Sequence, residues 1–274
     1  MIEVDEAGHG EHANGAANCV SVEGYRRSSY GDAFADVYDD WYHGVSDVPA
    51  TVALVAELAA PGRRVLELGV GTGRVAVPMA EQGLDVHGVD ASAAMLDRLR
   101  ARDVGGRVGT TLGDMVDDLP PGPFDVVLVA YNTLFNLESA RRQAACFCAV
   151  ADRLAPSGRF IVEAFVPEDP PRVGTVVSIR SMTVDEVVLS ISDHDPDAQR
   201  AAGHLVHFTD GAAVRLRPWA VRYAPPAELD DFAAAAGLRL VDRWEDVTRR
   251  LFTAESPQHV SIFGPAANEP GSSA

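Results

Sequence analysis

The stretch that decides the fold is VLELGVGTGR, residues 65–74. An apolar run typical of a buried strand leads into Gly69, Gly71 and Gly73, and helical spacing follows. Glycines allow a tight turn and a close backbone approach to a ligand, and a helix start supplies amides without partners. The spacing G-x-G-x-G differs from the G-x-G-x-x-G of dehydrogenases that bind a dinucleotide. The turn therefore predicts a nucleotide-like ligand and argues against a nicotinamide dinucleotide.

Strands and helices alternate on both sides of this turn. Short β-rich runs occupy 64–70, 84–90, 107–114, 124–130, 158–165, 238–246 and 259–263, and helices are expected at about 73–82, 92–102, 138–155 and 226–236. Such alternation is typical of a mostly parallel sheet with helices on both faces. We therefore expect a Rossmann-like α/β fold with a seven-stranded sheet, whose ligands bind beyond the carboxyl ends of the strands.

Four further runs interrupt this pattern. The segments at 175–184, 186–195, 202–210 and 213–224 alternate polar and apolar residues, which predicts an inserted antiparallel β lid with one solvated face. Arg215 and Arg217 alternate on one face of the last run and are most simply solvated. The expected organisation is a disordered tail at 1–27, a core with N-terminal helices at 28–170, the insertion at 171–225, the end of the core at 226–264 and a second tail at 265–274.

Composition restricts the partners. The chain has 274 residues, with 40 acidic and 23 basic side chains, so its formal charge is −17. This sign disfavours nucleic acid and anionic membranes, which repel such a protein. Three cysteines without CxxC spacing fit a reducing compartment, and no apolar run is long enough to span a bilayer. We expect a cytoplasmic protein with a small-molecule partner and no metal site. Its oligomeric state is open, with a homodimer as one alternative.

Carboxylates follow two of the strands. Asp90 ends its strand 21 residues after Gly69, where it can accept hydrogen bonds from both hydroxyls of a ribose. After the next strand, Asp114 can accept from an exocyclic amine, and Met115 offers a flat apolar surface. Either aspartate alone is as consistent with a helix N-cap or a solvated turn. Together with the glycine turn, they favour one site at the carboxyl ends of the strands.

The motifs VLELGVGTGR, VHGVDAS, GDM, FDVVLVAYNTLFNL and LAPSGRFIVEAF, spanning about 63–165, resemble those of class I S-adenosylmethionine-dependent methyltransferases. The resemblance implies S-adenosylmethionine as donor and S-adenosylhomocysteine as product. It implies that the three glycines pack against the methionine part and that Glu67 orders its amino group. It further implies that Asp90 holds the ribose and that Asp114 and Met115 frame the adenine. The implied donor-binding residues are Tyr30, Tyr38, Glu67, Gly69, Gly71, Gly73, Asp90, Ala91, Met95, Asp114, Met115 and Ala130.

The flanking segments resemble small-molecule methyltransferases that act on amines, including aminosugar and glycine N-methyltransferases. The shared features are Tyr30 followed by Tyr38, the VEAF strand end and the inserted strands. In that group a tyrosine at the position of Tyr30 lies beside the sulfonium. Asn136 stands where the aminosugar enzymes carry a histidine, which argues against an aminosugar acceptor and a histidine base. Actinobacterial natural-product enzymes are the most similar overall. The resemblance therefore implies in-line methyl transfer to an amine nitrogen without a metal.

The candidate catalytic residues are Tyr30, Tyr131, Asn132 and Glu163. Glu163 ends the fifth strand and either takes a proton, orients an amine or is a buried carboxylate bound by backbone amides. Tyr131 and Asn132 either contact the acceptor or cap the following helix. The alternative functions are C-methylation of an electron-rich ring such as indole, O-methylation, an NAD-dependent dehydrogenase and a non-catalytic binding protein with this fold.

Overall fold

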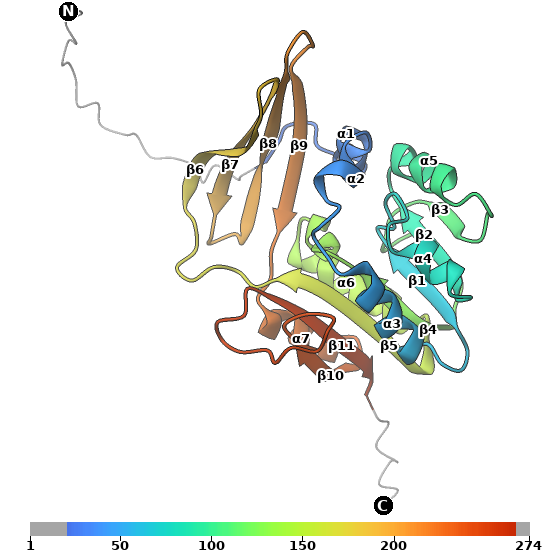
Figure 1. Cartoon of the computed structure of the whole chain (residues 1–274). Coiled ribbons are helices and arrows are strands. Elements are labelled where there is room, and N and C mark those ends of the chain that lie inside the picture. The colour runs from blue at the N-terminus through green and yellow to red at the C-terminus, as the bar shows by residue number, and fades with distance from the viewer. Residues whose placement is uncertain (1–20, 267–274) are drawn as a thin grey trace, which may run out of the picture.

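The computed structural model describes residues 21–266, and the sequence-predicted tails lie largely outside that range. The main sheet contains β1 (Arg64–Leu68), β2 (Asp85–Asp90), β3 (Gly109–Leu112), β4 (Phe124–Val129), β5 (Leu154–Phe165), β10 (Leu238–Trp244) and β11 (Gln258–Pro265). Their order is β10-β11-β5-β4-β1-β2-β3, and β11 runs antiparallel to both of its neighbours (Figure 1). The predicted seven-stranded, mostly parallel sheet is therefore confirmed.

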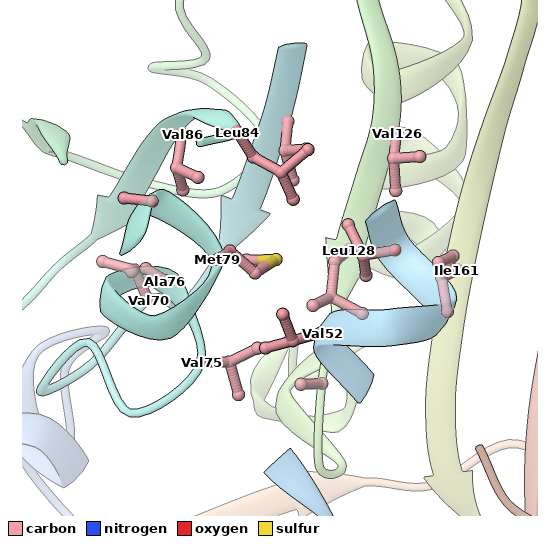
Figure 2. Packing of buried hydrophobic residues seen from close by; sticks show 14 of the residues in the cluster. Val52, Val70, Val75, Ala76, Met79, Leu84, Val86, Val126, Leu128 and Ile161 are labelled. Carbon is pink, nitrogen blue, oxygen red and sulfur yellow. The ribbon is translucent and has the colours of Figure 1, made fainter. Parts of the chain in front are cut away.

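Helices cover both faces of this sheet because successive strand residues point to opposite sides. Val126 and Leu128 pack with α3 (Val48–Leu58), α4 (Ala76–Glu81) and α5 (Ala93–Arg102). Val127 and Val129 pack with α6 (Ala140–Ala151) and α7 (Pro226–Ala235). Figure 2 shows Met79 of α4 among the valines and leucines of the first cluster. Each face thus has its own buried core, which holds the strand ends in place.

The insertion is a separate antiparallel sheet. It consists of β6 (Gly174–Met182), β7 (Glu186–Asp195), β8 (Arg200–Thr209) and β9 (Arg215–Arg222), paired in that order. Two short helices, α1 (Ser29–Phe34) and α2 (Tyr38–Trp41), lie between it and the main sheet (Figure 1). Phe34 of α1 packs in one cluster with Val188 and Leu205 of the insertion. The predicted antiparallel insertion is therefore present and closes against the N-terminal helices.

Several predicted boundaries differ from the structure. The helix expected at 138–155 ends at Ala151, and β5 already begins at Leu154, because Phe124 of β4 pairs with that residue. The predicted tail reached residue 27, whereas the described chain begins at residue 21, and Tyr25 packs against Ala202 of β8. Local periodicity carries no signal for such contacts between distant segments.

Candidate active site

The glycine turn after β1 has three glycines with positive φ, and each has a different surrounding. A Cβ on Gly69 would lie 2.3 Å from Thr133 Cγ2, so this glycine permits a close approach. A Cβ on Gly71 would meet no atom nearer than 3.9 Å, because the residue borders a cavity. A Cβ on Gly73 would lie 2.8 Å from Leu99 of α5. Gly73 therefore serves helix packing and does not line the cavity.

We call the hollow beside this turn the inner cavity; its volume is about 90 Å³. Residues that line it and that the sequence predicted are Tyr30, Tyr38, Gly69, Gly71, Asp90, Ala91, Met95, Asp114 and Met115. Lining residues that the sequence did not predict are Arg27, Gly31, Val89, Gly113, Thr133, Asn136 and Leu137. Glu67, Gly73 and Ala130 were predicted but do not line it. Most of the predicted donor residues thus converge on one hollow.

Glu67 lies in β1 and is 4% exposed. Burial raises the pKa of its carboxyl to about 8; Arg74 lowers that pKa, and Asp90 and Glu163 raise it further. The amide of Ala76 donates to the carboxylate, while Oε2 has no hydrogen-bond partner within residues 21–266. A buried acceptor without a partner is costly unless a ligand satisfies it. This carboxylate therefore fits a cationic ammonium group.

Asp90 is fixed at the end of β2 by backbone amides. Its Oδ2 accepts from Gly71 N and its Oδ1 from Ser92 N, both at 2.8 Å. Burial raises the pKa of this carboxyl. Each carboxylate oxygen has capacity for a second hydrogen bond, so the side chain remains able to accept from two hydroxyls. Ser92 also bonds Asp32 of α1 at 2.6 Å, which joins that helix to the site.

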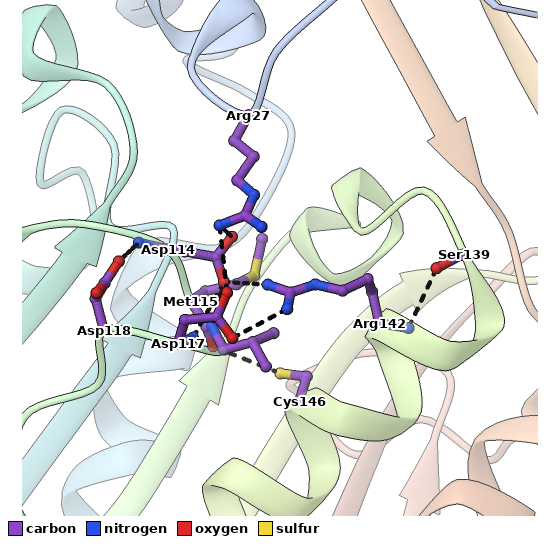
Figure 3. A network of polar contacts seen from close by, with 9 residues as sticks. Arg27, Asp114, Met115, Asp117, Asp118, Ser139, Arg142 and Cys146 are labelled. Carbon is purple, nitrogen blue, oxygen red and sulfur yellow. Dashed lines mark hydrogen bonds and ion pairs between the residues drawn. The ribbon is translucent and has the colours of Figure 1, made fainter.

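Asp114 lies between two arginines at the far end of the inner cavity (Figure 3). Its Oδ1 accepts from Val116 N at 2.8 Å, from Asp117 N at 3.1 Å and from Arg142. Its Oδ2 is 3.1 Å from Arg27 Nη1. Oδ1 is thus fully used, and Oδ2 is the atom that remains for an exocyclic amine, once the guanidinium of Arg27 moves.

A second hollow of about 780 Å³ adjoins the first, and we call it the aromatic cavity. The rings that line it belong to Tyr30, Phe34, Tyr38, Tyr42, Tyr131, Phe165, Trp219 and Tyr223. Glu168, Asp169, Arg172, His194 and Glu255 are its charged or titratable members. Four residues line both cavities: Tyr30, Tyr38, and Thr133 and Asn136 of the 3-10 helix η1 (Thr133–Asn136). A ligand in one hollow would therefore face a ligand in the other.

The tyrosines at this junction are packed ring against ring. Tyr30 stacks on Phe34 with ring centroids 4.4 Å apart, and Tyr38 lies 4.9 Å from Tyr42. Burial raises the pKa of Tyr30 and of Tyr38 far above neutral pH, so both hydroxyls keep their protons. Tyr30, Phe34, Tyr38 and Tyr42 lie four residues apart in sequence, but the segment forms two short helices, α1 and α2, with a break at residues 35–37.

Glu163 lies apart from both cavities. Its Oε2 accepts from Tyr131 N at 2.9 Å, and burial raises the pKa of the carboxyl. This geometry favours the interpretation in which backbone amides bind a buried carboxylate. Tyr131 and Asn132 line the aromatic cavity and both have positive φ, of 44° and 62°. Asn132 Oδ1 accepts from Phe165 N at 2.7 Å, so that side chain holds the turn to β5. Catalytic roles for these residues remain predictions.

Arg217 of β9 corrects the expectation of a solvated arginine pair. It is 2% exposed, and its Nη1 lies 2.6 Å from Asp36 Oδ1 while also donating to Ala33 O of α1. Its guanidinium lies 5.2 Å from the ring of Trp41. Arg215 is exposed as expected, although it also pairs with Asp36. Alternation along the strand places both arginines on one face of β9. It does not indicate that α1 covers Arg217 and leaves Arg215 exposed.

No group of three His, Cys, Asp or Glu side chains within 21–266 is arranged to hold a metal ion. Over the same range, no helix has the length and apolar character needed to cross a membrane. The two histidines and the cysteine of the first tail, His9, His12 and Cys19, lie outside the described residues.

Comparison with known proteins relates this site to methyl transfer. Residues 65–158 match the model of a family described as "Methyltransferase domain". The solved structure of the CcbJ methyltransferase from Streptomyces caelestis is 41% identical, with a TM-score of 0.83 over 89% of this chain and 100% of that chain. The DesVI structure from Streptomyces venezuelae, at 21% identity and TM-score 0.64 over 85% of this chain and 98% of that chain, shares the fold.

Similarity to curated sequences covers less of the chain. The cypemycin N-terminal methyltransferase of a Streptomyces species is 34% identical over 113 residues, which are 41% of this chain and 46% of that protein. An uncharacterized methyltransferase of Geobacillus kaustophilus is 31% identical over 51% of this chain and 61% of its own length. The chain thus spans roughly half to three fifths of the curated relatives that it matches.

Proposed function

The chain belongs to the class I S-adenosylmethionine-dependent methyltransferases, and from this premise we propose that it methylates an amine nitrogen of a small molecule in natural-product biosynthesis. We propose S-adenosylmethionine as the donor and direct in-line transfer, without a metal, as the mechanism. A relative named an N-terminal methyltransferase supports a nitrogen acceptor.

The observation that carries the proposal is the shared wall between the two cavities. Tyr30, Tyr38, Thr133 and Asn136 line both the inner cavity and the aromatic cavity. In-line displacement needs the nucleophile and the methyl carbon about 3–3.5 Å apart and aligned, and correct placement contributes about 7–11 kcal/mol to lowering the barrier. Two pockets that share an aromatic wall support such a placement.

The inner cavity, together with the buried carboxylate of Glu67 in β1, which does not itself line the cavity, offers donor-binding groups of the right chemistry. When bound, the donor supplies an electrophilic methyl group on a cationic sulfur. Glu67 offers a buried oxygen without a partner for the ammonium group, and Asp90 offers two oxygens for the ribose. Gly71 leaves space beside the turn where any side chain would intrude. Asp114 accepts from the exocyclic amine of adenine through Oδ2.

The aromatic cavity holds the acceptor as the free amine. The nitrogen lone pair forms the C–N bond as the C–S bond breaks, and the positive charge passes from sulfur to nitrogen. Aromatic faces stabilise a cation by about 0.5–2 kcal/mol each, so the rings of Tyr30 and Tyr38 favour this charge transfer without ionising. The N-methylammonium product then loses its proton. Glu163 is bound by Tyr131 N, which leaves that deprotonation to solvent or to a group on the cavity wall.

A screen with labelled donor tests the proposal. The chain is incubated with methyl-labelled S-adenosylmethionine and panels of amines, indoles and phenols, and products are read by mass spectrometry. We expect an amine that gains one methyl mass. In parallel, S-adenosylhomocysteine should bind 1:1 by calorimetry, and Asp90→Ala should abolish that binding. Binding of NADH in place of S-adenosylhomocysteine would contradict the proposal and favour a dehydrogenase.

C-methylation of an electron-rich ring is the second candidate. Phe165 and Tyr223, 6.3 Å apart, together with Trp219 form a wall on which an indole or phenol ring would stack. The two products carry the same added mass and differ in their exchangeable protons: C-methylation of an indole leaves its N–H in place, whereas N-methylation replaces one N–H, so hydrogen–deuterium exchange before mass spectrometry distinguishes the two candidates. An O-methylated phenol would instead lose that phenol's acidic proton.

A further inference from the structure

The guanidinium of Arg27 divides what would otherwise be one donor channel. On its inner side lies the inner cavity of about 90 Å³. On its outer side lies a recess of about 510 Å³ that opens to solvent. Arg27 and Asp114 line both spaces, as do Ala91 and Gly113. The two spaces therefore adjoin at this guanidinium and at Asp114.

We propose that Arg27 closes the adenine end of the donor site, and that the exocyclic amine of the incoming donor displaces it from Asp114 Oδ2. Residues 21–28 then form a strap, as we call this segment, that governs how fast the donor enters. This inference rests on the proposed function, because it takes the donor to carry adenine. It adds to that function a residue that competes with the donor for one carboxylate oxygen.

Asp114 is the fixed partner of this pair. Its side chain is 6% exposed, and the amides of Val116 and Asp117 and the guanidinium of Arg142 hold Oδ1. Oδ2 takes part in the contact with Arg27 at 3.1 Å. A carboxylate held by three donors does not turn away from the cavity. The donor must therefore move the arginine.

Arg27 is the movable partner. Its side chain is 61% exposed, and it belongs to a segment that precedes α1. The strap is attached at Tyr25, which packs against Ala202 and Ala220 of the insertion, and at Arg26 N, which donates to Ser29 Oγ at 2.8 Å. The guanidinium can therefore swing while its backbone stays attached.

Asp117 provides the place to which Arg27 moves. Its Oδ2 lies 3.3 Å from Arg27 Nη1, and its side chain is 50% exposed. The guanidinium already spans both carboxylates, so giving up Asp114 leaves the contact with Asp117 intact. Arg27 then remains at the rim of the channel beside the adenine. The strap thus opens by exchanging one of its two partners, and the charge does not have to become fully solvated.

The size of the effect follows from the exposure of the pair. An ion pair with one exposed partner contributes up to about 1 kcal/mol, which corresponds to about a five-fold change in an equilibrium constant. Removing the charge of Arg27 should therefore raise donor affinity by two- to five-fold, mainly through faster association. Salt screens exposed charges over about 8–10 Å, so higher ionic strength should accelerate association to the unaltered chain as well.

The test measures association and dissociation of S-adenosylhomocysteine by surface plasmon resonance at low and high salt. Arg27→Gln should bind about two- to five-fold faster than the unaltered chain at low salt and lose the acceleration by salt. Arg100→Gln is the matched control: it removes the same charge from an exposed pair with Asp97 on α5, lines neither space, and should behave like the unaltered chain. Arg27→Lys keeps the charge and should keep the slow association.

The outcomes separate this inference from the proposed function. If S-adenosylhomocysteine does not bind the unaltered chain, the proposed function fails. If it binds, and Arg27→Gln associates at an unchanged rate with an unchanged response to salt, the strap is refuted while the function stands. Weaker binding by Arg27→Gln, seen as faster dissociation alone, would also refute the displacement, because Arg27 would then be a contact of the bound donor.

Discussion

Donor binding should depend on pH through Glu67. Burial raises the pKa of this carboxyl to about 8, and its Oε2 has no partner among the described residues. Only the ionised form attracts the ammonium group of the donor. Below that pKa the carboxyl must release its proton before the ligand binds, so affinity should fall as the pH falls. Above it the carboxylate is already ionised, so affinity should stop rising and then fall once the ligand's own ammonium group loses its proton.

The magnitude follows from the ionised fraction. At about pH 6.5, a group with a pKa of about 8 is ionised to about 3%, and at about pH 8.5 to about 75%. The affinity for S-adenosylhomocysteine should therefore rise by about 25-fold over this range, or about 1.9 kcal/mol. Burial also raises the pKa of Asp90 from its ordinary value of 3.8, and the Asp90 carboxylate in turn raises the pKa of Glu67.

Isothermal titration calorimetry measures both the change in affinity with pH and the proton released on binding. In two buffers of different ionisation enthalpy, binding near pH 6.5 should release about one proton per ligand. Glu67→Gln keeps an oxygen acceptor and should abolish the pH dependence. A second control is 5′-methylthioadenosine, which lacks the amino-acid part and should bind with an affinity independent of pH. The reasoning is refuted if S-adenosylhomocysteine affinity is constant over this range, or if both ligands show the same dependence.

Three further predictions concern single side chains. Glu163→Gln should leave turnover within about two-fold of the unaltered chain, because the new amide oxygen still accepts from Tyr131 N. A loss of turnover on the order of 100-fold would instead identify the carboxylate as a general base. Tyr30→Phe should reduce turnover by about five-fold, which corresponds to the loss of one hydrogen bond. The thermal stability should not change, because the ring still stacks on Phe34. Unchanged kinetics would show that the residue serves packing alone. His259 is fully buried, and burial lowers its pKa to about 3, so it is neutral in the folded chain but charged in the unfolded chain below about pH 6.5. The contribution of His259 to the free energy of unfolding is therefore complete above that pH. This free energy should fall by about 2 kcal/mol between about pH 6.5 and 5, because the unfolded chain takes up the proton. Urea unfolding should show this loss, and His259→Gln should diminish it; an equal loss in the variant would contradict the assignment.

The convergence of residues on the inner cavity was largely predictable from sequence. Gly69 and Gly71 follow a strand at a spacing that predicts a ligand-binding turn, and Asp90 and Asp114 stand at the ends of neighbouring strands. The carboxyl ends of parallel strands meet at one edge of a sheet, so residues in those positions come together whatever the loops do. This geometric rule explains why most of the predicted donor residues line one cavity.

The remainder depends on contacts that no local pattern encodes. Arg27 meets Asp117 across 90 residues of sequence, and it lies in a segment that composition alone assigned to a tail. Glu163 ends a strand as predicted, but its partner is Tyr131 N, which a left-handed turn directs toward it. Whether one face of the insertion is buried depends on the packing of α1 against β9. The periodicity of residues along β9 does not indicate that packing. Sequence therefore located the strand ends better than it located their neighbours.

The two halves of this enzyme lie on different sheets, and that separation bears on how its substrate range can change during evolution. The groups proposed for the donor come chiefly from the loops of the seven-stranded sheet, whereas Ser190, Leu205 and Trp219 bring the four-stranded sheet into the acceptor wall. Substitutions on the inward face of that sheet can reshape the acceptor hollow while the donor loops keep their sequence. Arg217 restricts such changes, because its buried guanidinium pairs with Asp36 of the link between α1 and α2 and so joins this sheet to the N-terminal helices. Changes confined to the cavity-facing residues of β7, β8 and β9 can therefore alter the acceptor while that ion pair is kept.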